Sequence, residues 1–273
     1  MKIRNNIPNM NKCDSDDGWE WLTPDFYSGA YDRFIRLRWN IDPFPGEDHH
    51  LDPRAFVLSP EEQKKIPLSS ELVRFSFQHI VGEVNYFKSY IFDLKTWEKI
   101  LPEYNDESQK LHLLYKFVEP LLKCCLFAPY ALKNQIIFSG TKIAILLAKG
   151  KGQPKIPTDE NIRNISDFKQ WAETWADFDK LETALKVLSD KDFTDATKDF
   201  RHRYTHRIPP RIEVGIIRDY CLKHDGQNLR ISHHVEEPLP LSAAIKASVT
   251  QHRACVTAVR TFWHVLKARV ATS

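Results

Sequence analysis

The residues best suited to chemistry form one short run late in the chain, Arg201-His202-Arg203-Tyr204-Thr205-His206. At 100° per residue on a helix, Phe200 and Tyr204 lie on one side, whereas Arg201 and the two histidines lie on the other. We therefore expect the polar side chains on a solvent-reachable face and both aromatic rings buried. A guanidinium binds phosphate through a planar fork, and an imidazole takes up or releases a proton near neutral pH. Together they are suited to phosphodiester chemistry.

The residues that follow this run extend its basic character, because it continues as Arg207-Ile208-Pro209-Pro210-Arg211. Residues 201–273 hold 12 Lys and Arg against 5 Asp and Glu, whereas the preceding 200 residues are net negative, with 27 against 31. Such an asymmetry is typical of a phosphate-binding surface, most often one for nucleic acid, although a solvated basic face has the same composition. We expect Arg203, Arg207 and Arg211 to supply phosphate contacts.

The run resembles the R-x4-H motif of the HEPN superfamily, helical-bundle domains found in many bacterial toxins and defence ribonucleases. Arg201, the polar second residue His202 and His206 occupy the three motif positions. The HRIPPR continuation resembles one bacterial subfamily. The likeness covers six residues in sequence and roughly residues 69–273 in architecture. A second R-x4-H match, Arg74 to His79, has Phe75 at the second position and lies in an apolar segment, so we interpret it as a chance match.

The resemblance implies a metal-independent endoribonuclease that acts as a homodimer with a composite site and is a toxin or antiviral defence protein. His206 would be the general base on the ribose 2′-hydroxyl, Arg201 would bind the scissile phosphate, and His202 would orient or assist. No cofactor is implied. Some members carry a tyrosine two residues after the motif histidine that a partner antitoxin modifies, but that position here is Ile208. The alternative is a non-catalytic HEPN-like module that binds a nucleotide, RNA or a protein.

A metal site is a further alternative, because His202 and His206 are spaced i,i+4 as zinc ligands on a helix often are. His233-His234 with Glu236, or His49-His50 with Asp48, could complete it, but the glutamate of an HExxH motif is missing. The five cysteines form no CxxC pair, which argues against a zinc site or a disulfide framework. Because the chain also lacks a signal sequence and an apolar run of membrane-spanning length, we predict a cytoplasmic protein without membrane contact.

The elements that must position the motif are predicted to be helices, which gives an all-α, up-down bundle of the HEPN kind. Residues 1–60 are predicted as an irregular aromatic extension, with a short helix near Tyr31–Trp39, and residues 61–273 as the helical domain. Helices are expected over about 69–101, from 107 to a stop at Pro129 with a kink at Pro120, over 132–147, 166–188 and 192–206, and over 242–268. Apolar residues of the last helix, Val256 to Trp263, are expected at the dimer interface. A small hairpin, with strands near Arg211–Tyr220 and Leu229–Val235 and a turn at Asp225-Gly226, is predicted before the last helix.

Overall fold

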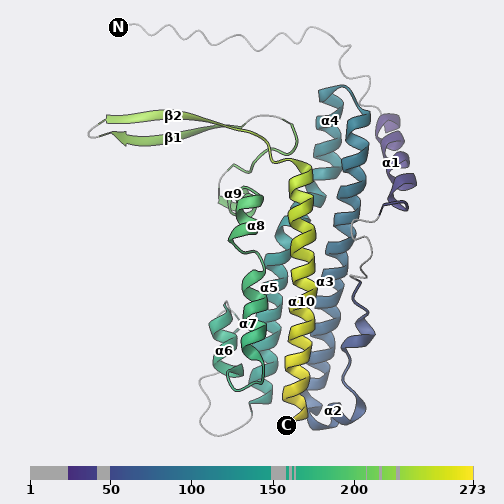
Figure 1. The fold of residues 1–273 in the computed structure, drawn as a ribbon, viewed down its shortest axis with the longest axis vertical. Coiled ribbons are helices and arrows are strands. Elements are labelled where there is room, and N and C mark those ends of the chain that lie inside the picture. The colour runs from purple at the N-terminus through teal and green to yellow at the C-terminus, as the bar shows by residue number, and fades with distance from the viewer. Residues whose placement is uncertain are drawn as a thin grey trace.

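The computed structural model describes residues 24–41, 50–148, 158–159, 162, 164–206, 208–214, 217–225 and 228–272 of the 273-residue chain, without the side chains of 68, 217–225 and 228–234. Three long helices form its body (Figure 1): α3 (Pro67–Ile100), α5 (Glu119–Leu147) and α10 (Leu241–Ala271). Lys65, just before α3, donates to the carbonyl of Ala271 at the end of α10, so α3 and α10 are antiparallel. Arg269 of α10 donates to the carbonyl of Leu147 at the end of α5, so α5 and α10 are parallel.

Four shorter helices return along the bundle between α5 and α10: α6 (Ile165–Ala172), α7 (Phe178–Val187), α8 (Lys191–Ala196) and α9 (Phe200–His206). The start of α7 lies beside the end of α10, where Asp177 is 3.7 Å from His264. Its end lies further back along α10, where Gln251 donates to the carbonyl of Val187. The described part of the chain is therefore an up-down-up-down arrangement whose third member is broken into pieces, and the expected all-α class is confirmed.

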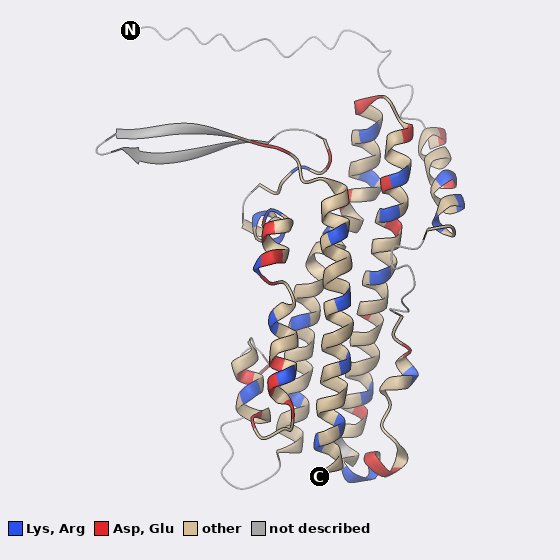
Figure 2. Cartoon of the chain, viewed as in Figure 1, with Lys and Arg blue, Asp and Glu red and all other residues tan. Residues whose placement is uncertain are grey.

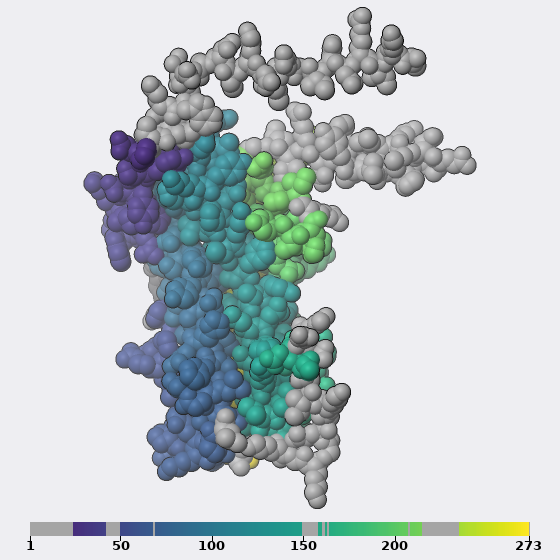
Figure 3. Space-filling model, turned by 180° about the vertical axis from the view of Figure 1, so that it is seen from behind, coloured from purple at the N-terminus to yellow at the C-terminus, as the bar shows by residue number. Residues whose placement is uncertain are grey.

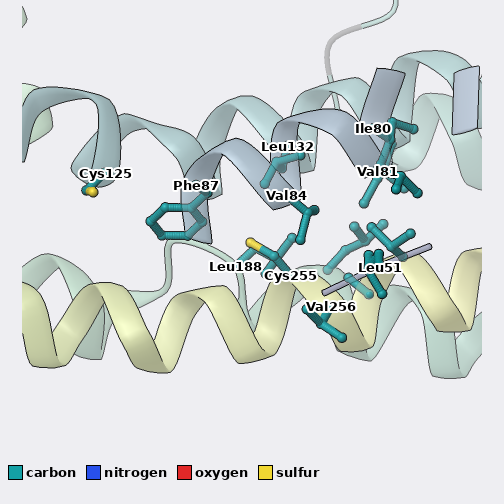
Figure 4. Close-up of a cluster of buried hydrophobic side chains, with 14 of the residues drawn as sticks. Leu51, Ile80, Val81, Val84, Phe87, Cys125, Leu132, Leu188, Cys255 and Val256 are labelled. Carbon is teal, nitrogen blue, oxygen red and sulfur yellow. The ribbon is translucent and has the colours of Figure 1, made fainter. Parts of the chain in front are cut away.

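The core lies where α3, α5 and α10 meet (Figure 4) and is made of apolar side chains that are almost fully buried. The Phe77 and Phe262 rings stack with their centroids 4.8 Å apart. Gly140 of α5 lets α6 approach closely, because a Cβ atom at this position would lie 2.4 Å from the Phe168 ring. Burial raises the pKa of the Cys125 and Cys255 thiols, which are free and pack as small apolar groups.

Helix α5 corrects the prediction that Pro129 ends a helix. A short α4 (Glu107–Leu113) leads through a π-helical turn (Leu114–Val118) into α5, which passes through Pro129 to Leu147. Pro120 lies directly after the π-helical turn, at the second position of α5, so the change in hydrogen-bonding pattern, not a stop, is what accompanies this proline. Pro129 is buried in the core with its apolar neighbours on α5, and this packing outweighs the lost backbone hydrogen bond.

Two predicted helices are interrupted where the backbone is left-handed. The segment 166–188 is divided at Asp177, with φ of 60°, and the segment 192–206 is divided at Lys198 and Asp199, with φ of 53° and 52°. A left-handed residue turns the chain out of the right-handed helix, so α7 begins anew directly after Asp177 and α9 directly after Asp199. These breaks let α7 and α9 take directions that a single straight helix would not allow.

The N-terminal region is more helical than predicted, because α1 spans Pro24–Arg38. It packs on α3 through Phe34, whose ring stacks on Trp97 at 5.1 Å, and through an ion pair of 2.5 Å between Arg38 and Asp93. A short α2 (Pro60–Lys65) precedes α3 and begins with a capping box at Ser59. The expected extension residues 1–23 and 42–49 lie outside the described residues.

A two-stranded antiparallel hairpin precedes α10, with β1 (Ile217–Asp225) paired to β2 (Asn228–Glu236). It lies where the hairpin was predicted, but β1 begins later, because Ile212 instead forms an isolated bridge with Leu239. The predicted turn residue Gly226 lies outside the described residues. Within the described ranges, no helix has the length and apolar character needed to cross a membrane.

Candidate active site on helix α9

Helix α9 is a two-turn helix bounded by a left-handed turn before it and by two prolines after it. It begins after the left-handed pair Lys198 and Asp199, and the Lys198 ammonium holds this turn by donating to the carbonyl of Glu237 at 2.7 Å. It ends before Pro209 and Pro210, which cannot continue a helix. Figure 3 shows the green segment that contains α9 lying against the teal surface of α5. The motif therefore lies on the outside of the bundle, against α5.

The motif histidines lie on the solvent-facing side of α9, as predicted from the helical phase. His202 and His206 are both exposed, and their ring centroids are 4.9 Å apart at an interplanar angle of 47°. Thr205, on the same side of α9, donates its hydroxyl back to the carbonyls of Arg201 and His202. Two imidazoles at this distance can contact one small substrate group together.

Arg201 is partly buried against α5 instead of extending freely into solvent. Its guanidinium carbon lies 3.9 Å from the centroid of the Tyr130 ring. Hydrogen bonding from the Asn134 side chain lowers the pKa of Tyr130, and Arg201 lowers it further, against the opposing effect of burial. The planar cation is therefore oriented by an aromatic platform on a neighbouring helix. Sequence reasoning missed Tyr130, because nothing in the sequence pairs a tyrosine of α5 with an arginine 71 positions later.

The predicted burial of both aromatic residues of α9 is correct for Phe200 and wrong for Tyr204. Phe200 is 3 % exposed, whereas Tyr204 remains 43 % exposed. The Tyr204 ring contacts Phe127 edge-on at 5.8 Å and lies 4.9 Å from the Lys123 ammonium. A helix of only two turns docks through one anchor residue, so its second aromatic ring lies at the edge of the contact.

The flanking arginines that were predicted to bind phosphate have different environments. Arg203 forms an ion pair of 2.6 Å with Glu236, and both side chains are less than 20 % exposed. It also donates to the carbonyl of Ile208 at 3.1 Å, so its guanidinium is engaged within the protein. Arg211 is exposed and donates to the hydroxyl of Tyr115. Arg207 lies outside the described residues.

A small pocket adjoins the motif between α5 and the segment that follows α9. Its volume is about 190 Å³, and its lining includes Lys123, Tyr204, Pro210 and Arg211. This volume is below the ~300–1,000 Å³ of sites for drug-sized ligands, so the pocket can accept one planar ring better than a whole ligand. Its walls combine flat apolar rings with two cations, a lining typical of sites that bind a base next to a phosphate.

The alternative sites have other partners in the structure. Glu236, a candidate metal ligand, binds Arg203, whereas the side chains of His233 and His234 lie outside the described residues, as do His49 and Asp48. Among the residues that the structure describes, no group of three His, Cys, Asp or Glu side chains lies close enough to hold a metal ion.

The second R-x4-H match contributes to local packing on α3. Arg74 pairs with Glu71 at 2.6 Å, and His79 lies 3.3 Å from the Gln135 amide of α5. Neither residue approaches α9 through any of these contacts. This match therefore offers a control for experiments on the motif at Arg201.

Comparison with protein-family models, with curated proteins and with solved structures found no match for this chain. The HEPN resemblance therefore depends on the motif and on the helical arrangement described above.

Proposed function

We propose that this protein is a metal-independent endoribonuclease of the HEPN kind, with Arg201, His202 and His206 as its active-site residues. The observation that carries the proposal is the exposed pair of imidazoles, 4.9 Å apart, on the same short helix as a guanidinium that contacts Tyr130. These are the groups that cleavage by 2′-hydroxyl attack requires: a base, a cation for the phosphate and a second proton-carrying group.

In the proposed reaction His206 removes the proton from a ribose 2′-hydroxyl, and the resulting oxygen attacks the adjacent phosphorus. The bond from phosphorus to the 5′-oxygen breaks, and this leaving oxygen takes up a proton. The products are a 2′,3′-cyclic phosphate and a 5′-hydroxyl, with no net change in protons or electrons. Arg201 stabilises the charge that develops on the phosphate oxygens, and His202 orients the phosphate or assists the proton transfer. DNA is inert because it lacks the attacking hydroxyl.

The decisive experiment incubates unstructured RNA with the purified protein in EDTA and analyses the product ends. We expect fragments with 2′,3′-cyclic phosphate termini from the wild type and none from Arg201→Ala or His206→Ala. His206 is exposed, so its replacement should change the free energy of unfolding by less than about 0.5 kcal/mol.

The matched control for this experiment is the double variant Arg74→Ala/His79→Ala, which removes the second R-x4-H match. It should cleave RNA like the wild type. Cleavage that is lost in EDTA and restored by zinc or manganese would contradict the metal-independent mechanism. Loss of cleavage in the control but not in His206→Ala would move the site to α3.

We also propose a homodimer in which the motifs of two chains meet, since one motif supplies a single Arg201 and an isologous interface doubles it. The stretch Val256 to Trp263 does not supply the expected apolar contact at Val256 and Phe262, because both are buried in the core of the same chain. An earlier part of the same helix offers an apolar surface, a groove of about 600 Å³ between α8 and α10 that is lined in part by Phe193 and Ala247. Ala247→Glu should therefore convert a dimer into a monomer in light scattering. A wild type that is monomeric at micromolar concentration and still cleaves at full rate would contradict the composite site.

The alternative function is a non-catalytic HEPN-like module that binds RNA, a nucleotide or a protein partner. The contact of Arg201 with Tyr130 favours this alternative, because it holds the partly buried guanidinium in a fixed position for binding. RNA that binds in an Arg201-dependent manner but is never cut, by monomer or dimer, would support this alternative. An antitoxin or regulatory partner remains a prediction in either case.

A further inference from the structure

Three half-exposed tyrosines lie where the π-helical turn and α5 meet α9 and the residues that follow it, and each contacts a cation from the other side of that junction. The tyrosine track, as we name this surface, consists of the pairs Tyr115–Arg211, Tyr204–Lys123 and Tyr130–Arg201. The tyrosine rings are 41 %, 43 % and 40 % exposed, respectively. In the same order, the cations lie 5.7, 4.9 and 3.9 Å from the ring centroids.

The pairs are arranged in a line, because the two segments that supply them run in opposite directions. Tyr115 and Tyr130 are separated by 15 positions along the π-helical turn and α5, which corresponds to about 22 Å of helix. The partners from the other segment follow in reverse order, with Arg211 beside the first ring and Arg201 beside the last. The pocket of about 190 Å³ lies between the first two pairs, since Lys123 and Arg211 both line it. The track therefore leads from the pocket to the motif arginine.

The charge along the track is positive. Glu119 is the acidic residue that lines the pocket, and it is paired with Lys123 at 3.8 Å. The guanidinium carbons of Arg201 and Arg211 lie over the Tyr130 and Tyr115 rings, and because each guanidinium carries five N–H donors, contact with one ring leaves others for phosphate oxygens. Aromatic faces that alternate with cations are the arrangement by which proteins hold a single nucleic-acid strand, with bases on the rings and phosphates on the cations. A duplex keeps its base faces stacked inside and cannot use such rings.

We propose that the tyrosine track binds a single-stranded nucleic acid by base stacking and delivers it to Arg201. The inference rests on the proposed function, since it names the substrate class of the same site, but the binding it describes needs no cleavage. Stacking does not depend on the 2′-hydroxyl, so single-stranded DNA should occupy the track without being cut.

The test measures fluorescence anisotropy of a labelled, mixed-sequence single-stranded DNA of about 12 nucleotides, within the ~4–16 nucleotides typical of such sites. Tyr115→Leu should raise the dissociation constant about 5- to 150-fold, the range that corresponds to the loss of one base–aromatic contact. Tyr115→Phe keeps the ring and should bind nearly as the wild type does. With three cations in contact, the log–log slope of affinity against salt should be about −2, and Arg211→Gln should reduce its magnitude by about 0.7.

Phe75→Leu is the matched control. The Phe75 ring is 59 % exposed and lies 4.5 Å from the Arg74 guanidinium, but this pair is on α3, outside the track. The variant should bind the probe within twofold of the wild type. Thermal unfolding of each variant shows whether a loss of binding reflects loss of the fold, and Arg211→Gln gives an independent reading if Tyr115→Leu is unstable.

Several outcomes would overturn the track. These are equal affinity for a duplex of the same sequence, equal weakening by Phe75→Leu, and unchanged binding in Tyr115→Leu. A surface that binds no nucleic acid but captures a protein partner would overturn it as well. RNA cleavage with normal probe binding in Tyr115→Leu refutes the track and leaves the proposed function intact. Probe binding that requires Tyr115, together with uncut RNA, supports the track and refutes the endoribonuclease.

Discussion

The ion pair between Arg203 and Glu236 allows a test of which arginines near the motif stabilise the fold and which are available to a ligand. The two side chains are 16 % and 18 % exposed, and Arg203 also donates to the carbonyl of Ile208. A hydrogen bond to a charged group contributes about 1.5–3 kcal/mol net, and removing one partner leaves a carboxylate that is largely shielded from water. We therefore expect Arg203→Gln to lower the local stability around α9 by about 2–3 kcal/mol.

This magnitude can be read by amide hydrogen exchange, because the contact fastens α9 and the end of β2 without extending into the core. A loss of about 2–3 kcal/mol corresponds to roughly 30- to 150-fold faster exchange of α9 amides that open locally. A double-mutant cycle with Glu236→Gln should give a coupling of about 1–2 kcal/mol, less than the loss in Arg203→Gln alone, because that loss also includes the hydrogen bond from Arg203 to the carbonyl of Ile208. Arg54→Gln is the control, since its ion pair with Asp52 is fully exposed on the arginine side and should change little.

The reasoning is refuted if Arg203→Gln leaves exchange in α9 unchanged. The reasoning is also refuted if the coupling energy between Arg203 and Glu236 is zero and Arg203→Gln lowers the salt dependence of RNA binding by the amount of one phosphate contact. Either result would support the role that the sequence predicts for Arg203, which is to bind phosphate.

Two further predictions concern packing and the environment of the motif arginine. Gly140→Ala places a methyl group against the Phe168 ring and should lower the free energy of unfolding, measured by urea denaturation, by about 1–3 kcal/mol. Gly82→Ala is the control, because nothing lies within 4 Å of the added carbon, and it should raise the free energy of unfolding by about 0.5–1 kcal/mol. Asn134→Ala should raise the pKa of Tyr130 in an NMR titration, because the hydrogen bond that favours the phenolate is lost; an unchanged pKa would contradict the described contact.

Much of the fold follows from the sequence. Apolar residues at helical spacing predict α3, the course of α5 after Pro129 and α10. The departures have local physical causes that pattern alone does not show. Pro129 interrupts no helix because buried packing outweighs one missing hydrogen bond. Asp177, Lys198 and Asp199 are left-handed directly before α7 and α9 although none of them is a glycine, and the Lys198 ammonium fastens its turn to the carbonyl of Glu237.

The sequence by itself determined that the motif histidines lie on one exposed face, because the phase of a helix depends only on residue spacing. It could not determine the partners of the motif arginines. Arg201 contacts Tyr130, and Arg203 contacts Glu236, from segments 71 and 33 positions away in the chain. Which basic residue faces a ligand and which one holds the protein together depends on long-range packing. Only the tertiary structure brings those side chains together, because spacing along one helix carries no information about what lies across from it.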